Sequence, residues 1–477
     1  MIDSPIAVDL DGTLILTDSL HESALRAVRE DASALIRIPA WLSRGRAHLK
    51  HELAQRSAFN PETLPYNQSL LEWLKAQREQ GRHLVLCTAA DMSIARKVAD
   101  HLGLFNEVMA SDGQTNLSAS AKAAALVEKF GPNGFDYVGN SADDLHVWKV
   151  ARRAIVVNAT DRVVRAAATV CPVDLVLAPP ERTVDVVPKV LRLHQWVKNL
   201  LLFIAPLAAH QLPEGRQAVA MLLAFVSFSL CASAVYVMND LFDLDSDRAH
   251  PRKRRRPFAA GEMKVSEGVV LAPLLLLLAF VFAGLVGNDF MEWLLIYFGL
   301  TTAYTWGLKR LILLDCVALA VLYTLRIIAG AAAAGLPLSF WLLAFSVFLF
   351  LSLAFVKRYA ELAALTTSRD VQAPGRAYRV SDSPLVKSLG ISAGYAAVVV
   401  LALYLNSEAV IKLYASPMTL WCAVLVMLFW VSWIWMKAHR GQMHDDPVLF
   451  ALRDRMSLAS GAMMAVIVVV ASRGWPW

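Results

Sequence analysis

The sequence predicts two parts with different folds, a Rossmann-like α/β domain over residues 1–185 and an all-α membrane domain over residues 186–477. Two observations support this division. Short apolar runs alternate with helical stretches in the first part, whereas long apolar stretches alternate with short polar ones from about Leu191 onward. The chain is also 57% hydrophobic and 18% charged, which is more apolar and less charged than soluble domains usually are.

The first part contains four apolar runs that predict the strands of a parallel, doubly wound sheet, at residues 6–9, 84–88, 135–139 and 154–157. Helical stretches such as 68–80 and 91–102 separate these runs. Residues 15–65 are mostly helical and carry no predicted strand, so we expect an inserted helical cap after the first strand. Residues 176–190 are expected to form the linker to the second part.

The second part contains about nine candidate membrane spans, at residues 196–212, 217–238, 268–286, 290–307, 311–332, 339–356, 391–406, 416–436 and 457–472. With the N-terminus inside, the cytosolic loops hold 19 Lys and Arg residues, and the opposite loops and tail hold 3. This bias predicts a multi-pass protein of the inner (cytoplasmic) membrane. The N-terminus does not have the pattern of a signal peptide, so we expect the first domain to lie in the cytosol.

The net charge of +6 does not indicate nucleic-acid binding, because the basic residues concentrate in loops between apolar segments, where membrane topology explains them. The five cysteines have no paired spacing, so the sequence predicts neither a cysteine metal site nor a disulfide framework. The oligomeric state stays open, and an oligomer is compatible with the sequence.

Two carboxylates, Asp9 and Asp11, follow the first predicted strand in the run Asp-Leu-Asp-Gly-Thr. Because they stand two positions apart at a strand end, their side chains point the same way. One carboxylate can attack phosphorus while the other transfers protons. Gly12 permits the sharp turn that follows the strand.

Three more motifs follow in chain order. Thr88 ends the second predicted strand, where its hydroxyl can hold a phosphate oxygen, and Lys122 can neutralise the phosphoryl charge. Asn140 and Asp144 follow another strand and can reach a metal ion. The sequence therefore predicts a phosphoryl-transfer site at one edge of the sheet.

The four motifs together resemble the haloacid dehalogenase (HAD) superfamily over about residues 4–175. The resemblance implies that Asp9 is the nucleophile, that Asp11 is the acid and base, and that Thr88 and Lys122 bind phosphate. The Mg²⁺ ligands implied are Asp9, Asp11, Asn140 and Asp144. The family usually has Asp at the position of Asn140, which is a neutral and weaker ligand, so a non-catalytic HAD domain is the alternative.

A second acidic cluster lies where the second predicted span meets the cytosol, at Asn239, Asp240, Asp243 and Asp247. On a helix the three aspartates, at i, i+3 and i+7, share one face. Their charges repel unless cations bridge them, and clustered oxygens suit Mg²⁺ that carries a diphosphate. A solvated acidic loop is the alternative, although acids at a membrane boundary are costly and usually functional.

This cluster resembles the first aspartate-rich motif of the UbiA superfamily of intramembrane prenyltransferases, over about residues 188–472. Those enzymes usually carry a second acidic motif, DxxxD, after the fourth span. Here Tyr304, Lys309 and Arg310 stand in that region, followed by a single Asp315. A phenol and two cations can bind a phosphate directly, so we expect a phosphate rather than a second metal there.

More polar residues lie at the predicted cytosolic ends of spans. Arg326 lies within the fifth span, nearly in line with Asp315. A buried arginine needs a partner, and a phosphate or a carboxylate would serve. The basic run 252–256 is explained by the positive-inside bias or by a lid-like contact with pyrophosphate. The other candidate substrate-binding residues at these ends are Lys198, Asn199, Lys357 and Arg358.

Taken together, the membrane motifs resemble the decaprenyl-phosphate phosphoribosyltransferase branch of the UbiA superfamily. The resemblance implies transfer of 5-phosphoribosyl from phosphoribosyl pyrophosphate (PRPP) to a polyprenyl phosphate in the lipid bilayer. Mg²⁺ on the aspartates would hold the departing pyrophosphate, and the cations would hold the donor 5-phosphate and the lipid phosphate. The fused domain would then remove the phosphate from the product.

Two other functions are open. An aromatic-acceptor prenyltransferase would use the same aspartate motif, but the absence of a second DxxxD argues against it. A membrane-tethered sensor or scaffold without catalysis is the other, and the intact aspartate motif argues against that.

Overall fold

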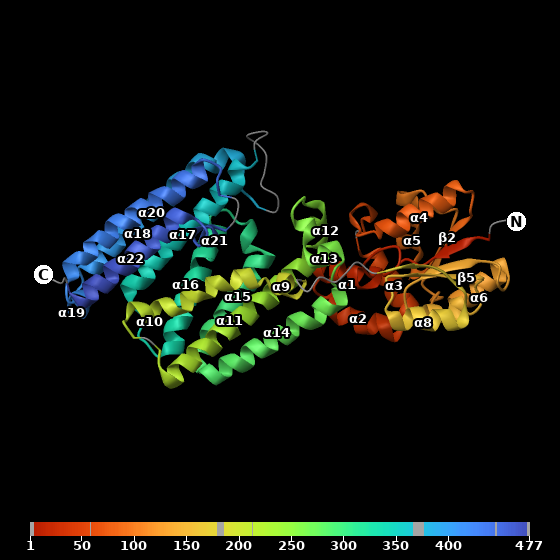
Figure 1. Cartoon of the computed structure of the whole chain (residues 1–477), viewed down its shortest axis with the longest axis horizontal. Helices are drawn as coiled ribbons and strands as arrows, with labels where there is room; N and C mark the ends of the chain where they lie inside the picture. Colours follow the sequence, from red (N-terminus) through yellow and green to blue (C-terminus); the bar gives the residue numbers. More distant parts are fainter. Residues whose placement is uncertain are drawn as a thin grey trace. The chain divides into compact units, whose positions relative to one another are not determined.

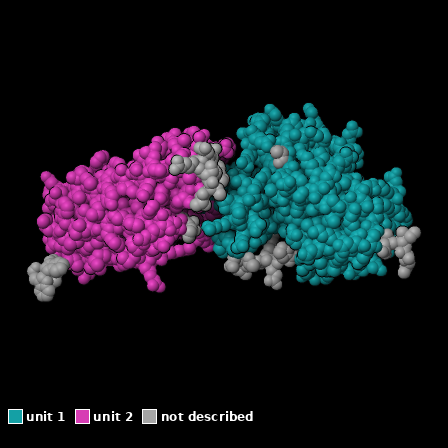
Figure 2. Space-filling model, turned by 90° about the horizontal axis from the view of Figure 1, so that it is seen from above, with its two compact units in different colours: residues 1–191, 236–273 teal, residues 192–235, 274–477 magenta. Residues whose placement is uncertain are grey.

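The computed structural model describes residues 4–57, 59–178, 186–211, 213–365, 376–443 and 446–474. The chain forms two compact units, which Figure 2 shows in different colours. Unit 1 contains residues 1–191 and 236–273, and unit 2 contains residues 192–235 and 274–477. Two of the divisions fall inside long helices, α11 (Gly215–Phe242) and α14 (Val265–Val286). The predicted boundary between residues 185 and 186 adjoins residues 179–185, which lie outside the described residues.

Unit 1 contains a six-stranded sheet in the order β3-β2-β1-β4-β5-β6, and every adjacent pair is parallel. The central strand β1 aligns Val8 with Leu86 of β2 and with Val138 of β4. The strands are β1 (Ile6–Val8), β2 (Leu84–Asp91), β3 (Glu107–Ser111), β4 (Asp136–Gly139), β5 (Arg153–Val157) and β6 (Val173–Leu177). A Rossmann-like parallel sheet was predicted, and the structure confirms it.

Helices cover both faces of this sheet because its strands are apolar on both sides. Figure 1 shows α4 and α5 on one side and α6 and α8 on the other. Ile6 and Val8 pack with the first pair, and Ala7 packs in the opposite core. These helices are α4 (Gln68–Glu79), α5 (Met92–Leu102), α6 (Ala119–Phe130), α7 (Leu145–Trp148, after η2, Ala142–Asp144) and α8 (Asp161–Val170).

The four predicted strands are present, but β3 and β6 were not predicted. The predicted linker 176–190 is wrong at its start, because Val176 and Leu177 belong to β6 and pair with β5. The residues of β6 are only partly buried, so the run lacks the continuous apolar character of a central strand. The other end of the predicted linker is regular structure as well, because helix α9 spans Val186–Leu191.

The insertion after β1 is helical, as predicted. It contains α1 (Ser19–Glu30), α2 (Ala34–Ser43), α3 (Arg46–Gln55) and the short η1 (Pro61–Thr63). Asp18 caps α1, because its side chain accepts a hydrogen bond from the His21 backbone N–H. Unit 1 also includes α12 (Leu244–Ala249), η4 (Lys253–Arg255) and α13 (Pro257–Ala260).

The described residues of unit 2 are helical. Seven described helices are long and apolar enough to cross a membrane, and two of them, α11 and α14, extend into unit 1. The seven are α11, α14, α16 (Leu314–Ala334), α17 (Phe340–Ala363), η6 (Val380–Asp382) with α18 (Ser383–Leu405), η7 (Pro417–Leu420) with α20 (Trp421–His439), and α22 (Arg455–Arg473). The predicted span 290–307 coincides with α15 (Asn288–Trp306). The predicted span 196–212 contains η3 (Leu193–Phe203) and α10 (Ile204–Ala208) instead of one long helix. The chain is therefore a multi-pass membrane protein, and the count of nine spans stays a prediction. The remaining short elements are η5 (Leu308–Arg310), α19 (Glu408–Leu413) and α21 (Pro447–Ala451).

Small residues allow close helix packing in unit 2. A Cβ on Gly390 of α18 would lie 2.2 Å from the Trp435 ring, and one on Gly394 would lie 2.6 Å from Val431. A Cβ on Gly330 of α16 would lie 1.9 Å from the Leu202 carbonyl oxygen of η3. Glycine is therefore required where η3, which carries two candidate site residues, meets α16.

Candidate functional site

The first candidate site lies at the carboxyl ends of β1 and β4. Here the strand order reverses, and open parallel sheets bind ligands at such points. Lys122 Nζ donates hydrogen bonds to Asp9 Oδ1 (2.9 Å) and to the Tyr137 hydroxyl (2.9 Å). That hydroxyl donates in turn to Asp144 Oδ1 (2.8 Å). The fold thus brings three predicted residues from distant parts of the sequence into one hydrogen-bonded group.

Burial and neighbouring charges have opposite effects on the pKa values of this group. Burial raises the pKa of Asp9, even though the Lys122 ammonium opposes the shift. Burial alone would lower the pKa of Lys122, but the carboxylates of Asp9 and Asp144 outweigh it, so the pKa is raised and the lysine stays charged. A buried, permanently charged lysine can stabilise negative charge that develops on a phosphoryl group.

Asp11 is held by the first residue of α1. The Ser19 backbone N–H donates to Asp11 Oδ1 (2.7 Å), and the Ser19 hydroxyl donates to Oδ2 (3.1 Å). Burial, with the nearby charge of Asp18, raises the pKa of Asp11 to about 7. A carboxyl group with such a pKa can both give and take a proton near neutral pH.

Asn140 lies against the turn that follows Asp9. Gly12 has a φ of +71°, and a Cβ there would lie 2.3 Å from the Asn140 amide nitrogen, so the turn requires glycine. Asp144 Oδ2 accepts bonds from the Asn140 N–H, the Ser141 N–H and the Ser141 hydroxyl. Asp144 therefore shapes this loop through its hydrogen bonds.

Thr88 was predicted to end its strand, and this is wrong. Strand β2 continues to Asp91, with a register shift after Cys87. The Thr88 hydroxyl accepts a hydrogen bond from the Ala90 N–H (3.0 Å) and is fully buried. The hydroxyl proton remains a donor for an anion at the strand end.

Lys50 of α3 is a residue of this region that sequence reasoning missed. Its Nζ donates to the Ala89 carbonyl (2.6 Å) and to Asn116 Oδ1 (2.8 Å). Burial lowers its pKa, although Asp11 and Asp18 oppose the shift. The helical insertion thus brings a cation next to the strand that carries Thr88. Lys50 is the single lysine of residues 15–65, but no motif spacing in the sequence marks it as a site residue.

The second candidate site, also in unit 1, is the aspartate cluster of Asp240, Asp243 and Asp247. The expected single helix is interrupted, since α11 ends at Phe242 and Asp243 has φ −98° and ψ 13° before α12 begins. Helical hydrogen bonds nevertheless cross the break, from the Asp243 N–H to the Asn239 carbonyl and from the Asp247 N–H to the Asp243 carbonyl. Asp240 and Asp247 therefore still converge.

Arg256 lies between these two carboxylates. Its Nη1 donates to Asp240 Oδ1 (2.9 Å) and to Asp247 Oδ2 (2.6 Å). Within the described residues, no group of three or more His, Cys, Asp or Glu side chains is arranged around one point. The two carboxylates do converge on one cationic nitrogen, so this pair fits a bound cation. Arg256 was expected only as part of the basic run 252–256.

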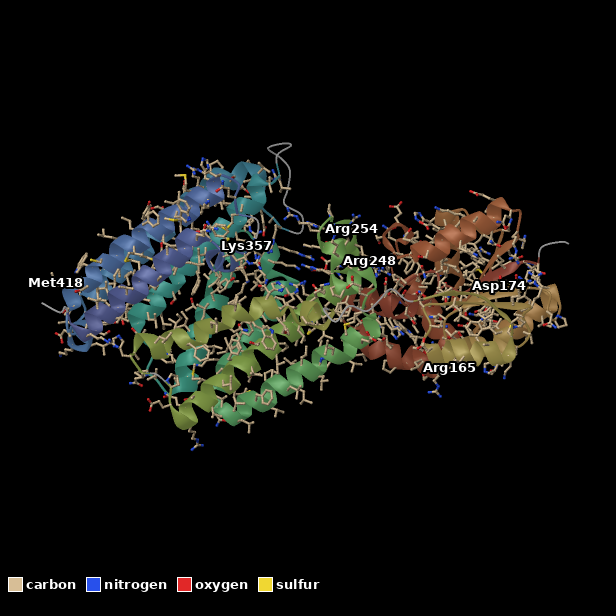
Figure 3. The ribbon with its side chains drawn as sticks, viewed as in Figure 1. Arg165, Asp174, Arg248, Arg254, Lys357 and Met418 are labelled. Atoms are coloured by element: carbon tan, nitrogen blue, oxygen red, sulfur yellow. The ribbon has the colours of Figure 1, made fainter. Side chains whose placement is uncertain are left out.

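The third candidate site is a basic cluster in unit 2, made of Lys198, Tyr323, Lys357 and Asp446. Lys198 Nζ lies 2.7 Å and Lys357 Nζ 3.6 Å from Asp446 Oδ2. The Tyr323 hydroxyl lies 3.0 Å from Oδ1 and 3.1 Å from Oδ2 of the same carboxylate. Figure 3 labels Lys357 on α17. Asp446, which sequence reasoning missed, is thus the anion that joins two predicted lysines.

Arg326 lies deep in unit 2, where its protein partners include an amide and aromatic side chains. Its Nε donates to Asn199 Oδ1 (3.0 Å), and its Nη2 donates to the Tyr297 hydroxyl (3.1 Å). Its guanidinium also lies 4.9 Å from the centre of the Tyr297 ring and 5.4 Å from that of Tyr323. Aromatic faces and an amide stabilise this charge.

Asp315 pairs instead with Arg358. Arg358 Nη2 lies 2.6 Å from Asp315 Oδ2, and both side chains are fully buried. The predicted Tyr304 and Lys309 both contact Arg376, whose Nη1 donates to the Tyr304 hydroxyl (2.9 Å) and to the Lys309 carbonyl (3.1 Å). Arg358 as placed is therefore part of the internal packing, while Tyr304 and Lys309 are half-buried.

An apolar cavity of about 550 Å³ adjoins the basic cluster in unit 2. Val197, which precedes Lys198, and Val448, two residues after Asp446, both line it. The remaining lining side chains come mainly from η3, α20 and α22, for example Leu201, Trp430 and Met464. An apolar chain that carries an anionic end would match this arrangement.

Comparisons with known proteins bear on the same residues. A family model described as the UbiA prenyltransferase family matches residues 200–461, which is more than half of the chain. An uncharacterized protein of Sinorhizobium fredii, y4nM, is 38% identical over 475 residues, covering 98% of this chain and 91% of that protein. The decaprenyl-phosphate phosphoribosyltransferase of Mycobacterium tuberculosis is 38% identical over 195 residues, covering 40% of this chain and 64% of that enzyme. The structure of a UbiA homolog from Archaeoglobus fulgidus bound to GPP and Mg²⁺ covers 60% of this chain and 100% of its own, with 15% identity and a TM-score of 0.46.

Proposed function

Because the chain belongs to the UbiA prenyltransferase family, we propose that it is a membrane transferase that moves 5-phosphoribosyl from PRPP to a polyprenyl phosphate. The observation that carries this choice is the basic cluster beside the apolar cavity. A polyprenyl phosphate joins an apolar chain to one anionic group, so part of the chain would occupy the cavity and the phosphate would meet Lys198 and Lys357.

The donor is proposed from two further observations. Relatives named decaprenyl-phosphate phosphoribosyltransferase are 38–39% identical to this chain over about 40% of it. The second acidic motif expected in a prenyl diphosphate enzyme is replaced here by Tyr304 and Lys309. Both observations favour a donor that carries a further phosphate besides its leaving pyrophosphate. Lys309 would bind that further phosphate.

The reaction requires little from the protein beyond binding and charge. An oxygen of the lipid phosphate attacks C1 of the ribose, the bond from C1 to pyrophosphate breaks, and pyrophosphate leaves with the electron pair. The lipid phosphate is already ionised, so no general base is needed. Asp240, Asp243 and Asp247 would hold Mg²⁺, which when bound neutralises the pyrophosphate charge. The convergence of Asp240 and Asp247 on Arg256 supports this assignment.

The transfer is tested with radiolabelled PRPP and polyprenyl phosphate in membranes that contain the full chain, with the lipids separated by thin-layer chromatography. Asp240→Ala should lower kcat by about a hundredfold or more, because losing a metal ligand removes several kcal/mol of charge stabilisation. The control is Asp289→Ala, which changes an exposed aspartate outside the motif. Transfer of a prenyl group to an aromatic acid, without phosphoribosyl transfer, would contradict the proposal.

For the N-terminal domain we propose a HAD-type phosphatase that acts on the phosphoribosyl lipid. The product of the transfer carries a terminal phosphomonoester, and Asp9 would attack its phosphorus to form a phospho-aspartate that water then hydrolyses. Asp11 would protonate the leaving oxygen and later activate water. Both sites are proposed to face the cytosol, and covalent fusion raises the local concentration of product.

Asp9→Asn should abolish this second step and leave the first intact, because it removes the nucleophile of the phosphatase site and leaves the membrane site unchanged. Labelled 5-phosphorylated lipid should accumulate, whereas the wild-type chain should convert it to the ribosyl lipid. Asp100→Asn on the exposed face of α5 is the matched control. Equal accumulation in wild type and Asp9→Asn would assign the domain another substrate or a structural role.

A further inference from the structure

Helix α1 of the N-terminal domain carries a buried carboxylate, Glu22, that is 1% exposed. Arg248 of α12 binds it with both arms of its guanidinium, from Nη2 to Oε1 (2.6 Å) and from Nη1 to Oε2 (3.0 Å). Thr17 Oγ1 and Arg26 Nη2 also donate to this carboxylate, at 2.6 and 2.9 Å. Every hydrogen bond here involves a charged partner and is therefore strong.

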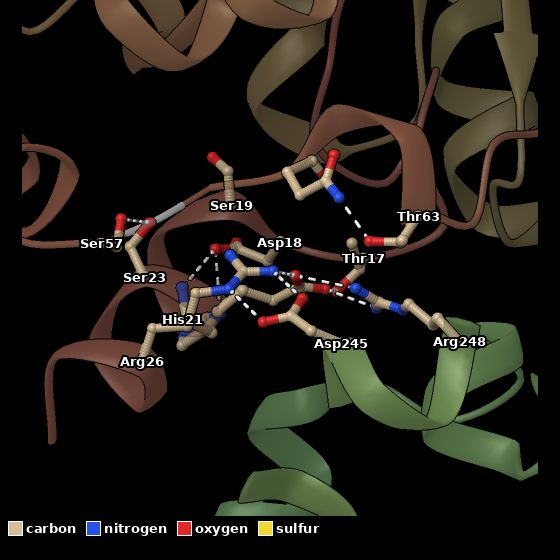
Figure 4. Close-up of polar contacts among 12 residues, drawn as sticks. Thr17, Asp18, Ser19, His21, Ser23, Arg26, Ser57, Thr63, Asp245 and Arg248 are labelled. Carbon is tan, nitrogen blue, oxygen red and sulfur yellow. Dashed lines mark hydrogen bonds and ion pairs between the residues drawn. The ribbon is translucent and has the colours of Figure 1, made fainter. Parts of the chain in front are cut away.

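A second bidentate pair joins the same two segments. Arg26 donates from Nε to Asp245 Oδ2 (2.9 Å) and from Nη2 to Asp245 Oδ1 (2.7 Å). One turn further along α1, Arg29 donates to the Phe242 carbonyl (2.8 Å). Figure 4 shows Arg26 and Thr17 coming from the insertion, and Asp245 and Arg248 coming from the segment after α11. We call Glu22, Arg26, Asp245 and Arg248 the clamp.

The clamp holds one residue within the span of the aspartate cluster, Asp245, and one directly after it, Arg248. Arg248 directly follows Asp247, and its Nε donates to the Ala259 carbonyl of α13 (3.2 Å). α13 in turn begins one residue after Arg256, which bridges Asp240 and Asp247. Fixing Arg248 therefore fixes both Asp247 and the segment that carries Arg256.

Charge gives Glu22 a second effect. The clamp contains two guanidinium groups and two carboxylates, so its charges balance. If Glu22 were neutral, Arg248 would lose its carboxylate partner while lying next in sequence to Asp247. Its guanidinium would then compete with a metal ion for the carboxylates of the aspartate cluster.

We propose that Glu22 is a positioning residue for the aspartate cluster, holding Arg248 away from the metal-binding carboxylates and fixing the segment that carries them. The N-terminal domain thereby supports the membrane transferase through α1, whose first residue also holds Asp11. This inference rests on the proposed function only in assigning a metal ion to the aspartates.

The decisive measurement is the affinity of the full chain for Mn²⁺ in lipid nanodiscs with no substrate present. Electron paramagnetic resonance detects the bound Mn²⁺. Asp9→Asn is included in all samples to weaken metal binding at the first site. Glu22→Gln should weaken the affinity at the aspartate cluster by about tenfold to a hundredfold, as expected when a residue supporting metal ligands is lost. Glu22→Asp, which keeps the charge, should recover part of that loss. Glu30→Gln, on the exposed end of α1, should leave the affinity unchanged.

Hydrogen–deuterium exchange over residues 236–260 in the same samples separates positioning from unfolding. Faster exchange confined to residues 242–248, together with weaker Mn²⁺ binding, supports the inference. Unchanged Mn²⁺ binding in Glu22→Gln overturns it, whether or not exchange changes. If Glu22→Gln does not fold, Asp245→Asn is measured instead, because this half-exposed partner can be neutralised at lower cost. Absence of phosphoribosyl transfer in the wild-type chain would refute the proposed function and leave these outcomes unaffected.

Discussion

At the residue scale, one carboxylate organises the basic cluster of unit 2. Burial alone would raise the pKa of Asp446, but Lys198 and Lys357 outweigh it and hold that pKa well below its ordinary range. The side chain therefore stays ionised and offsets part of the charge of two lysines, which would otherwise be costly next to an apolar cavity. A substrate phosphate would compete with Asp446 for the same ammonium groups.

Lys198→Gln should raise KM for the polyprenyl phosphate about tenfold, because a charge-assisted hydrogen bond contributes roughly 1.5–3 kcal/mol. The contact is made equally in the ground and transition states, so kcat should change less than KM. Initial rates at varied lipid concentration provide the measurement. Lys412→Gln, which alters an exposed lysine of unit 2, is the control. A normal KM for both substrates would assign Lys198 to internal packing.

At the element scale, α1 holds two separate groups of residues. Its N-terminus holds Asp11 through Ser19, and its middle turns hold α12 through Glu22 and Arg26. Such a helix cannot slide without disturbing both groups. In the proposed scheme, the N-terminal domain supports the membrane transferase through this helix without supplying a residue to the reaction.

The pH dependence of stability should report this helix. Burial alone would raise the pKa of Glu22, but Arg248 and Arg26 outweigh it, so the pKa lies below the ordinary value of 4.5. The pKa of Asp245 is lowered as well, because Arg26 outweighs burial. A lowered pKa in the folded state means that the stabilisation is complete above the unfolded value and is lost as pH falls through the folded value.

Thermal unfolding of the full chain in nanodiscs should therefore shift to lower temperature between about pH 5 and pH 3. The shift should be smaller in Glu22→Gln, which has lost one titrating group, and unchanged in Glu30→Gln. Parallel pH profiles for wild type and Glu22→Gln would contradict the assignment of Glu22 as a charged partner of Arg248.

At the scale of the whole molecule, the chain combines a parallel α/β sheet with a helical membrane domain. The excess of Lys and Arg in alternate loops predicts that residues 239–264 and the N-terminal domain face the cytosol. Both proposed reactions depend on that orientation. In this scheme PRPP comes from the cytosol, and the phosphoribosyl lipid is presented to the phosphatase at the cytosolic membrane surface.

Thiol labelling tests the orientation. In a background with Cys422→Ala, which removes the exposed native thiol, Ser246→Cys should react with a membrane-impermeant maleimide in inside-out vesicles. Glu408→Cys, in the opposite loop, should react in right-side-out vesicles. The reverse pattern would place both proposed sites outside the cytosol.

The sequence by itself determined the division into two folds, the four main strands in their order along the chain, and the polar motifs that follow them. These features are local, since composition over a span or residue type at a strand end is visible in a few neighbouring positions. For the same reason the sequence could point to Asp9, Asp11, Lys122 and the aspartate cluster as candidate site residues, which they remain. The partly buried edge strands β3 and β6 lack that local signal and were missed.

Only the tertiary structure decided which side chains meet. Glu22 and Arg248 are 226 residues apart, and Lys198 and Asp446 are 248 apart, so no spacing in one sequence pairs them. The protein partners of Arg326 and Asp315 lie on other elements, which alignment along one helix does not reveal. Ion-pair partners are chosen by the packing of whole elements, which buries some charges together and leaves others apart.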